Sequence, residues 1–506
     1  MELGIYVVCF ISCVSARMNV LFLCADDLRP ELPMYNGFYR PSQVHPPIHV
    51  PNLEGLASKS MVFKRAYTQQ ALCSPSRTSL LTGRRPDTTH VYDLRTYFRD
   101  SAGNFTTIPQ FFKNHGYHSI GAGKIFHPGV GSGGNDPVSW SETYYDDYQP
   151  YDYRTSWEAV PDNLLDSHNA LQDTMLADHA VQVIKDIAQK AKNGENFFLA
   201  VGFHRPHLPF QFPARFLDYY PEDSIDLPPN PQAPDGMPEI AWYSYNELRS
   251  YADIARLNAS GNPNTTLPDQ VVKQLRRAYY SAVSFMDFEL GRVLDELENQ
   301  GLADNTIVSF FGDHGWQLGE HGEWGKQTNF DIATHSPLMI RVPGMTDHGM
   351  STTKLTEFVD LFPTLVEAAG LPTLPTCQVD SSSTHACTEG RSLVPLLQHP
   401  NLPSWKTAAF SQYPRVYNNT SAMGYAITTW RYRYTEWVTF LSMPHYMPQW
   451  DQLHGVELYD HLADPEENHN LALNAAQQGL RSRLSGQLHA GWRAEMTDGH
   501  GRPIVG

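Results

Sequence analysis

The sequence predicts an α/β protein with a large, mostly parallel central sheet flanked by helices, followed by a smaller C-terminal α+β domain with an antiparallel sheet. Helical patterns alternate with short apolar runs as far as residue 400, which is typical of a parallel sheet covered on both faces. Beyond it the chain is rich in aromatic residues and threonine, as antiparallel strands are. The 506 residues are also too many for one ordinary core. We therefore expect a large domain over 17–400 and a smaller one over 401–506.

The first sixteen residues, 1–16, are expected to be a signal peptide. They form an apolar run that ends in Val14-Ser15-Ala16, the small-residue pattern that a signal peptidase needs, although Glu2 is the only charged residue. A buried first strand is the alternative interpretation. No later run is long enough to span a membrane, so no membrane span is expected in the mature chain.

Each main element of the large domain has its own pattern. Apolar residues recur at helical spacing in four segments, and apolar runs of strand length lie between them. The predicted helices are 52–58, 108–114, 169–192 and 268–299. The predicted strands are 19–25, 117–123, 197–203 and 306–312.

Glycosylation sequons support passage of the chain through a secretory route. Five Asn-x-Ser/Thr sequons occur, at Asn104, Asn258, Asn264, Asn418 and Asn419. Such sequons also arise by chance, and the last two overlap so closely that only one of them is expected to be used.

Four of the six cysteines remain once the predicted signal peptide is removed. Cys377 and Cys387 bracket a Ser/Thr-rich loop, and a disulfide that closes this loop is the natural interpretation in an oxidising compartment. Cys24 lies in the apolar run 19–25 and is predicted to be a core residue. Cys73 is then the unpaired thiol that needs another explanation.

Charged and imidazole side chains follow the four predicted strands of the large domain. In chain order they are Asp26, Asp27, Lys124, His127, His204, Asp313 and His314. Parallel strands end at the same edge of a sheet, and ligands bind there. Taken singly, the Asp pair could cap a helix, Asp-His-Gly could form a turn, and a lysine or histidine could lie in a loop. Their accidental meeting at one edge is a much weaker explanation, so we expect a functional site.

Three of these residues are carboxylates, which repel one another unless a cation is present. Oxygen ligands favour Ca²⁺ or Mg²⁺, whereas a nitrogen ligand from His314 is unusual for such ions. Arg77, Lys124 and Lys326 add positive charge, which suits an anionic tetrahedral group such as sulfate or phosphate. Because the net charge of the chain is −17, only this local field can attract an anion, and no nucleic-acid partner is expected.

Cys73 is predicted to lie at the N-terminus of a short helix that ends at Gly83. There the helix dipole would favour a thiolate and would bind an anion. A tyrosine phosphatase loop has a longer spacing than the three residues that separate Cys73 from Arg77. The residues alone therefore indicate an anion site with a metal and a cysteine of unexplained role.

The run from Cys73 to Arg84, CSPSRTSLLTGR, resembles the signature of the sulfatase family, in which the cysteine is oxidised to Cα-formylglycine before folding. The resemblance covers nearly the whole mature chain. It is carried also by NVLFLCADDLRPEL, GKIFHPG, VGFHRPHLPF, FFGDHGWQLGEHGEWGKQTNFDIATHSPL, SQYPR and WRYRYTEWV. It implies an alkaline-phosphatase-like α/β fold with a smaller C-terminal domain, and a formylglycine-generating enzyme as a partner during biosynthesis.

The resemblance also implies a role for each site residue. One Ca²⁺ would be bound by Asp26, Asp27, Asp313, His314 and an oxygen of modified Cys73.

In the implied reaction, the hydrated aldehyde at position 73 attacks sulfur. His204, with Lys326, would protonate the departing sugar oxygen. His127 would take a proton from the second hydroxyl, so that the aldehyde reforms and sulfate leaves. The residues that would stabilise negative charge are Arg77, Lys124 and Lys326.

Within the family, the chain is most similar to the branch that removes the 2-sulfate of terminal iduronate from dermatan sulfate and heparan sulfate. That branch shares His314, where other sulfatases commonly carry Asn or Gln. The implied substrate is a sulfated glycosaminoglycan, and the implied location is the lysosome, with secretion as the alternative. Trp316 is a candidate pocket wall, although an aromatic residue in a loop is as often a packing residue.

Three other functions stay open at this point. Another carbohydrate sulfatase would share every motif. A phosphatase or phosphodiesterase of the same superfamily would tend to have Ser or Thr at position 73 and a second metal. A non-catalytic secreted glycoprotein that binds sulfated glycans would keep an unmodified thiol at Cys73 or lack a metal ligand.

Overall fold

A seven-stranded sheet forms the centre of the large domain in the computed structural model, which describes residues 17–38, 45–146, 149, 152–166 and 168–496. The strand order is β12-β2-β11-β8-β1-β6-β4. The bounds are β1 Asn19–Ala25, β2 Met61–Phe63, β4 His118–Gly123, β6 Phe197–Phe203, β8 Thr306–Gly312, β11 Leu338–Arg341 and β12 Met350–Thr352. Neighbouring strands are parallel except where β11 pairs with β8 and β2, so the prediction of a mostly parallel sheet is confirmed. The predicted signal peptide lies outside the described residues.

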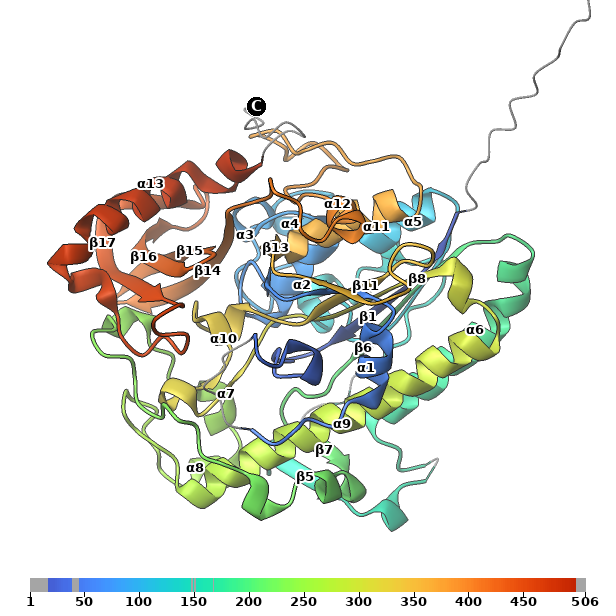
Figure 1. Ribbon diagram of the computed structural model, residues 1–506, viewed down its shortest axis with the longest axis horizontal. Helices are drawn as coiled ribbons and strands as arrows, with labels where there is room; N and C mark the ends of the chain where they lie inside the picture. The colour runs from blue at the N-terminus through green and yellow to red at the C-terminus, as the bar shows by residue number, and fades with distance from the viewer. Residues whose placement is uncertain (1–16, 39–44, 147–148, 150–151, 167, 497–506) are drawn as a thin grey trace, which may run out of the picture.

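Helices cover both faces of this sheet, because alternate residues of β1 point into two different cores. Leu21 and Leu23 pack in one core with α1 Pro51–Ala57, α6 Gln172–Lys192 and α9 Asp269–Asn299. Phe22 and Cys24 pack in the other core. Its helices are α2 Cys73–Thr82, α5 Ile108–Asn114, α11 Leu361–Ala368 and α12 Val394–Gln398. Figure 1 shows the two groups of helices on opposite sides of the sheet. Cys24 is a free, buried core cysteine, as predicted.

The C-terminal part of the chain forms a four-stranded antiparallel sheet, which confirms the predicted change of architecture. Its strands are β14 Ala408–Tyr417, β15 Thr420–Thr429, β16 Tyr432–Leu441 and β17 Met447–Asp460, in that order. Helix α13 Gln478–Glu495 packs on it through Leu484 and Leu488 (Figure 1). The domain boundary at residue 400 stays a prediction.

Shorter elements complete the described chain. The pairs β3 with β13, β5 with β7 and β9 with β10 form two-stranded sheets. The strand bounds are β3 Ala66–Tyr67, β5 Trp157–Val160, β7 Phe210–Pro213, β9 Gln317–Leu318, β10 Trp324–Gly325 and β13 Thr356–Glu357. The short helices are α3 Pro86–Thr89, α4 Phe98–Ser101, α7 Asn246–Arg249, α8 Ala252–Ala255 and α10 Asp331–Thr334. None of the described helices combines the length and apolar character needed to cross a membrane.

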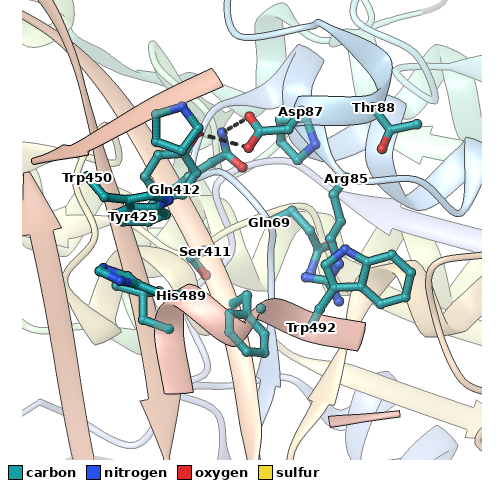
Figure 2. Close-up of a pocket in the computed structure, with 16 residues that line it drawn as sticks. Gln69, Arg85, Asp87, Thr88, Ser411, Gln412, Tyr425, Trp450, His489 and Trp492 are labelled. Atoms are coloured by element: carbon teal, nitrogen blue, oxygen red, sulfur yellow. Dashed lines mark hydrogen bonds between the residues drawn. The ribbon is translucent and has the colours of Figure 1, made fainter. Parts of the chain in front are cut away.

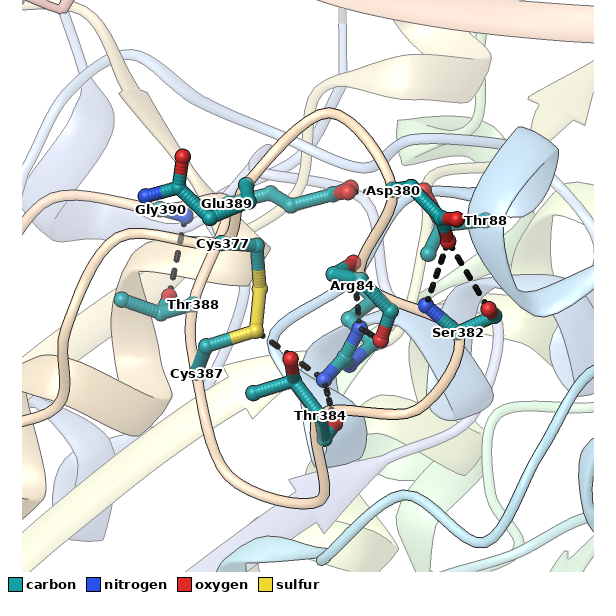
Figure 3. The surroundings of a disulfide bond; sticks show 12 residues. Arg84, Thr88, Cys377, Asp380, Ser382, Thr384, Cys387, Thr388, Glu389 and Gly390 are labelled. Carbon is teal, nitrogen blue, oxygen red and sulfur yellow. Dashed lines mark hydrogen bonds between the residues drawn. A yellow bond between two sulfur atoms is a disulfide. The ribbon is translucent and has the colours of Figure 1, made fainter. Parts of the chain in front are cut away.

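The predicted disulfide between Cys377 and Cys387 is present, and its loop packs against the end of α2. Helix α2 ends at Gly83, whose φ of 64° lies in the left-handed region that glycine adopts without strain. The next residue, Arg84, donates hydrogen bonds to Ser381 Oγ at 2.8 Å and to Cys387 Sγ at 3.0 Å (Figure 3). The disulfide loop therefore fixes the C-terminal end of the helix that begins with Cys73.

Candidate active site

The ends of β1 and β8 bring two pairs of polar residues together at one edge of the sheet. Asp26 and Asp27 follow β1, and Asp313 and His314 follow β8. The Asp27 N–H donates to Asp313 Oδ1 at 3.1 Å, which ties the two strand ends together. Asp27 has a φ of 63°, which breaks the strand's alternation of side chains. Two consecutive carboxylates can therefore face the same point.

Cys73 is the first residue of α2 and is 2% exposed. Its Sγ lies 3.4 Å from Asp26 Oδ1 and 3.8 Å from Lys124 Nζ. Burial, together with the Asp26 carboxylate, raises the pKa of the Cys73 thiol. Burial and the neighbouring carboxylate therefore oppose the thiolate that the helix dipole was expected to favour.

Arg77, one turn along α2, bridges the two strand ends. Its Nη2 lies 3.1 Å from Asp26 Oδ1, and its Nε lies 2.9 Å from Asp313 Oδ2. Lys124, which follows β4, forms an ion pair with the second oxygen of Asp26. Burial alone would raise the pKa of Asp26, but the positive charges of Lys124, His207 and Arg77 lower it well below its ordinary value. Asp26 is thus a carboxylate held ionised by its neighbours.

Lys326, which follows β10, lies between two carboxylates. Its Nζ is 3.0 Å from Asp27 Oδ1 and 3.1 Å from Glu247 Oε2, in α7. The same Nζ lies 4.8 Å from the centre of the Trp316 ring, a cation–π contact. Trp316 is fully buried, so its ring contacts Lys326 inside the protein and does not form an open pocket wall.

His207 and Glu247 belong to this cluster, although sequence reasoning did not single them out. His207 Nε2 lies 3.1 Å from Glu247 Oε1 and 3.8 Å from Asp27 Oδ2. Burial and Lys326 act to lower the pKa of His207, but with the Asp27 and Asp26 carboxylates nearby it is raised to about 9. His207 could have been predicted as a site residue, because it is the second histidine of HRPHLPF after β6. Glu247 lies in a short helix far from any strand end, and its sequence context does not indicate a site residue.

His204 follows β6 and is oriented by Asp173 in the first turn of α6. Asp173 Oδ1 lies 3.3 Å from His204 Nδ1 and accepts the His204 backbone N–H at 2.8 Å. The other ring nitrogen, Nε2, lies 3.2 Å from Gln172 Nε2. Asp173 therefore fixes the ring and favours a proton on Nδ1, which leaves Nε2 as the exchangeable atom.

His127 lies in the loop after β4, within the electrostatic field of Lys124. Its Nδ1 is buried and has no hydrogen-bond partner among the described residues. Burial, together with the charge of Lys124, lowers the pKa of His127 to about 3. His127 is therefore a neutral imidazole at neutral and mildly acidic pH.

Several of these residues form a compact set of metal-ligand atoms. One atom each from Asp26, Asp27, Cys73 and His314 lie within 4.8 Å of one another, and all four residues are buried. His314 Nε2 is also buried without a hydrogen-bond partner in the described chain. Asp313 is placed differently, because its carboxylate already accepts from Arg77 Nε and from the His314 backbone N–H at 3.0 Å. His314 Nε2 also lies 3.5 Å from Asp313 Oδ2, and a ring nitrogen without a hydrogen bond beside several carboxylates fits a cation.

The site borders a cleft of 550 Å³ between the two domains. Three of its wall residues, Leu72, Asn246 and Gln327, are chain neighbours of Cys73, Glu247 and Lys326. The remaining wall includes the aromatic residues Tyr92, Trp242, Tyr243 and Tyr413 and the cationic residues Arg95 and Arg415. A ligand in the cleft would therefore meet positive charge and aromatic surface beside Cys73.

Comparison with known proteins agrees with this arrangement. A family model described as Sulfatase matches residues 18–371, and one described as N-sulphoglucosamine sulphohydrolase, C-terminal, matches residues 319–493. The chain is 37% identical over 525 residues to the iduronate 2-sulfatase of Mus musculus, a match that covers 92% of this chain and 93% of that protein. It is 38% identical over 520 residues to the iduronate 2-sulfatase of Homo sapiens, covering 91% and 92%.

A solved structure resembles the fold over nearly its whole length. It is a protein in complex with its substrate D-glucosamine-2-N,6-O-disulfate, with a TM-score of 0.66 and 20% identity over 94% of this chain and 97% of that one. At this identity the likeness concerns the fold alone, and it confirms the predicted alkaline-phosphatase-like α/β architecture with a smaller C-terminal domain.

Proposed function

The chain belongs to the sulfatase family and is a hydrolase of sulfate esters, and we propose that its substrate is the 2-sulfate of terminal iduronate in dermatan sulfate and heparan sulfate. The geometric observation that carries the proposed reaction is buried Cys73, which lies beside the ion pair of Asp26 and Lys124 at the N-terminus of α2. The identity of 37% and 38% to two iduronate 2-sulfatases supports the choice of sugar.

The reaction requires modification of Cys73 to Cα-formylglycine by a formylglycine-generating enzyme. Formylglycine supplies a hydrated aldehyde, one hydroxyl of which is the nucleophile toward sulfur. The position suits this role, because its side chain is 2% exposed and is contacted by Asp26 and Lys124. Burial of this position strengthens the electrostatic interactions of the site.

The same cluster would bind one Ca²⁺. Asp26, Asp27, Asp313, His314 and residue 73 would hold it, and the ion would supply positive charge that polarises an oxygen of the sulfate. The charge balance of the protein alone supports this assignment. The carboxylates of Asp26, Asp27, Asp313 and Glu247 face the cations Arg77, Lys124, Lys326 and His207. Opposite charges are equal in number, so an anionic substrate needs further positive charge.

Two histidines would move protons on opposite sides of the sulfur. His204 presents Nε2 because Asp173 holds Nδ1, so it is suited to protonate the departing sugar oxygen together with Lys326. His127 is a neutral imidazole and is suited to take a proton from the nucleophile side. Lys124, Lys326 and Arg77 would stabilise the charge that develops on the sulfate.

The cleft beside Cys73 would hold the sugar. Arg95 and Arg415 line it and would attract the uronate carboxylate and neighbouring sulfates. Arg415 is positioned by hydrogen bonds from Nη2 to the Gln327 carbonyl at 2.6 Å and from Nε to the Trp242 carbonyl at 3.2 Å.

We also infer a lysosomal location reached through the secretory pathway, with secretion as the alternative. The disulfide between Cys377 and Cys387 fits an oxidising compartment. All five sequon asparagines have exposed side chains, so the folded surface is compatible with glycosylation.

Two measurements on protein from cells that can install the aldehyde test this proposal. Peptide mass spectrometry of the fragment that contains position 73 should find formylglycine in place of cysteine. Parallel assays should show iduronate-2-sulfate to be a better substrate than glucosamine-6-sulfate, galactosamine-4-sulfate and a phosphate monoester. An intact thiol with full activity would overturn the reaction, whereas an aldehyde with iduronate-2-sulfate as the poorest substrate would overturn only the choice of sugar.

A further inference from the structure

A second cavity lies between the end of α2 and the C-terminal sheet, away from the cleft beside Cys73. It has a volume of 190 Å³ and shares none of the cleft's lining residues. Its walls come from the segments around Gln69 and Asp87, from β14, β15 and β17, and from α13. We call it the aromatic pocket (Figure 2).

Aromatic side chains form two opposite sides of the aromatic pocket. Trp450 and Tyr425 lie on one side with ring centres 5.1 Å apart, and His489 lies 4.1 Å from Trp450. Trp492 lies on the other side, beside Arg85, as Figure 2 shows. Trp492 follows Gly491, whose φ of 71° interrupts α13. Both tryptophans are only partly buried, although Arg85 and Arg493 lie over the Trp492 ring at 5.3 and 4.1 Å.

The charged groups of the aromatic pocket are already engaged with other protein groups. Arg85 pairs with both oxygens of Glu357, at 2.8 and 2.9 Å. Asp87 accepts hydrogen bonds from Tyr92, Gln412 and Tyr425 at 3.0, 2.7 and 2.9 Å. His489 lies 2.8 Å from Glu436. Among the described residues that line the pocket, each cation is therefore already paired with a carboxylate.

One polar side chain of the wall has no partner. Gln69 is 1% exposed, and both Nε2 and Oε1 of its amide are buried without a hydrogen bond in the described chain. Its backbone is fixed, because the Gln69 carbonyl accepts the Gln412 N–H at 2.8 Å. Figure 2 shows Gln69 between the two aromatic sides. An unpaired buried amide is costly, so this amide in the wall of a cavity favours a ligand with a donor and an acceptor.

We propose that the aromatic pocket binds one uncharged pyranose residue of a glycan, such as a hexose or an N-acetylhexosamine. Its ring would lie against Trp450 and Trp492, and its hydroxyl or acetamido group would pair with the Gln69 amide. The volume equals that of about six water molecules, which suits a single sugar ring. The paired charges exclude a sulfated or carboxylated residue. This binding does not depend on which sugar sulfate the active site hydrolyses.

The substitution Gln69→Leu separates ligand binding from folding. Leucine keeps most of the volume and removes both unpaired polar atoms, so the unfolding temperature of the free protein should stay the same or rise. Binding of the methyl glycosides of galactose, N-acetylglucosamine and N-acetylgalactosamine is measured by saturation-transfer NMR and tryptophan fluorescence. We expect saturable binding of at least one of them to the wild type and at least tenfold weaker binding to Gln69→Leu.

Matched variants complete the test. Gln70→Leu changes an adjacent buried glutamine that does not line the pocket and should retain binding, whereas Trp450→Ala should weaken it at least tenfold. Activity on a small sulfated substrate shows that each variant is folded and should be unchanged in Gln69→Leu. Absence of saturable binding to the wild type, or equal binding by wild type and Gln69→Leu, overturns the proposal.

A comparison of KM values for substrates of different length shows whether the sugar belongs to the substrate chain or to a separate glycan. If the pocket holds a later residue of the substrate chain, a longer oligosaccharide should be hydrolysed with a lower KM than a disaccharide, and Gln69→Leu should remove that gain. If it holds a residue of a separate glycan, the wild type and Gln69→Leu should show the same KM for every chain length. Both results require that the pocket binds the neutral glycoside.

Discussion

Helix α2 leads from one buried cluster of charges to another, and the two clusters are built differently. At its N-terminus, Cys73 and Arg77 lie among the carboxylates at the strand ends. Beyond its C-terminus, Arg85 pairs with Glu357, which also binds Lys406 at 3.0 Å. We call the second group the Glu357 cluster; its members are Arg85, Glu357, Asp360 and Lys406.

In the Glu357 cluster every carboxylate oxygen has a donor. Glu357 accepts from Arg85 twice, from Lys406 and from the Phe410 backbone N–H. Asp360 accepts from Lys406 and from the Arg391 backbone N–H. At the sheet edge the oxygens of Asp26 and Asp27 also have donors, but atoms of Asp26, Asp27, Cys73 and His314 converge within 4.8 Å of one another. Among the described residues, the imidazole nitrogens His314 Nε2 and His127 Nδ1 there have no hydrogen-bond partner. The convergence of possible metal ligands and imidazole nitrogens, more than buried charge itself, therefore distinguishes the chemical site from the structural one.

The largest expected effect comes from removing one charge at the sheet edge. Asp26→Asn should lower kcat on a sugar sulfate by roughly 10³-fold, because Lys124 and residue 73 lose a shared partner and the metal loses a ligand. In the wild type, Ca²⁺ should raise the unfolding temperature, and a chelator should reverse the rise. Asp26→Asn should lose this response. If Asp26→Asn keeps the wild-type kcat and the calcium response, the sheet edge would not be a chemical site distinct from the Glu357 cluster.

The matched change in the Glu357 cluster should act on stability alone. Glu357→Gln breaks a buried pair and should lower the free energy of unfolding by about 3–5 kcal/mol. Because no member of the cluster contacts residue 73, kcat per folded molecule and the calcium response should stay at wild-type values. Denaturant unfolding and active-site titration measure the two quantities. A fall in kcat of the folded fraction would show that the Glu357 cluster serves the chemistry as well.

The smallest expected effect is the pH dependence of the loss in unfolding free energy caused by Glu357→Gln. Burial would raise the pKa of Glu357, but Arg85 and Lys406 lower it from 4.5 to about 2. A carboxyl group with a lowered pKa stabilises the fold fully above its ordinary pKa and loses this contribution as the pH falls through the lowered value. The difference in unfolding free energy between wild type and Glu357→Gln should therefore be constant from about pH 7 to 5 and shrink only below 4.5. A penalty that declines already above pH 5 would contradict the assigned pairing.

The residues at the sheet edge could be predicted from the sequence because each apolar strand stops where a polar residue follows it. Asp26, Lys124, His204 and Asp313 each follow such a run, and parallel strands end together. Cys73 was placed correctly at a helix N-terminus because Gly83 marks the other end of the helix.

Residues that depend on packing between distant segments could not be predicted in this way. Glu247 reaches Lys326 from a short helix with no periodic pattern, and Asp173 reaches His204 from the start of α6. The Glu357 cluster and the aromatic pocket each join segments hundreds of residues apart. No spacing along the chain encodes such contacts, since they are set by how the two sheets pack.

The depth at which Cys73 lies has a consequence for biosynthesis. Every residue of α2 is buried in the finished fold. Under the proposed modification, oxidation and chain collapse therefore compete during synthesis, and a molecule that closes first stays inert for its lifetime. The specific activity of a preparation would then depend on the fraction of molecules oxidised at Cys73 before α2 is buried. Conditions that slow the folding of the chain around α2 would yield a larger active fraction.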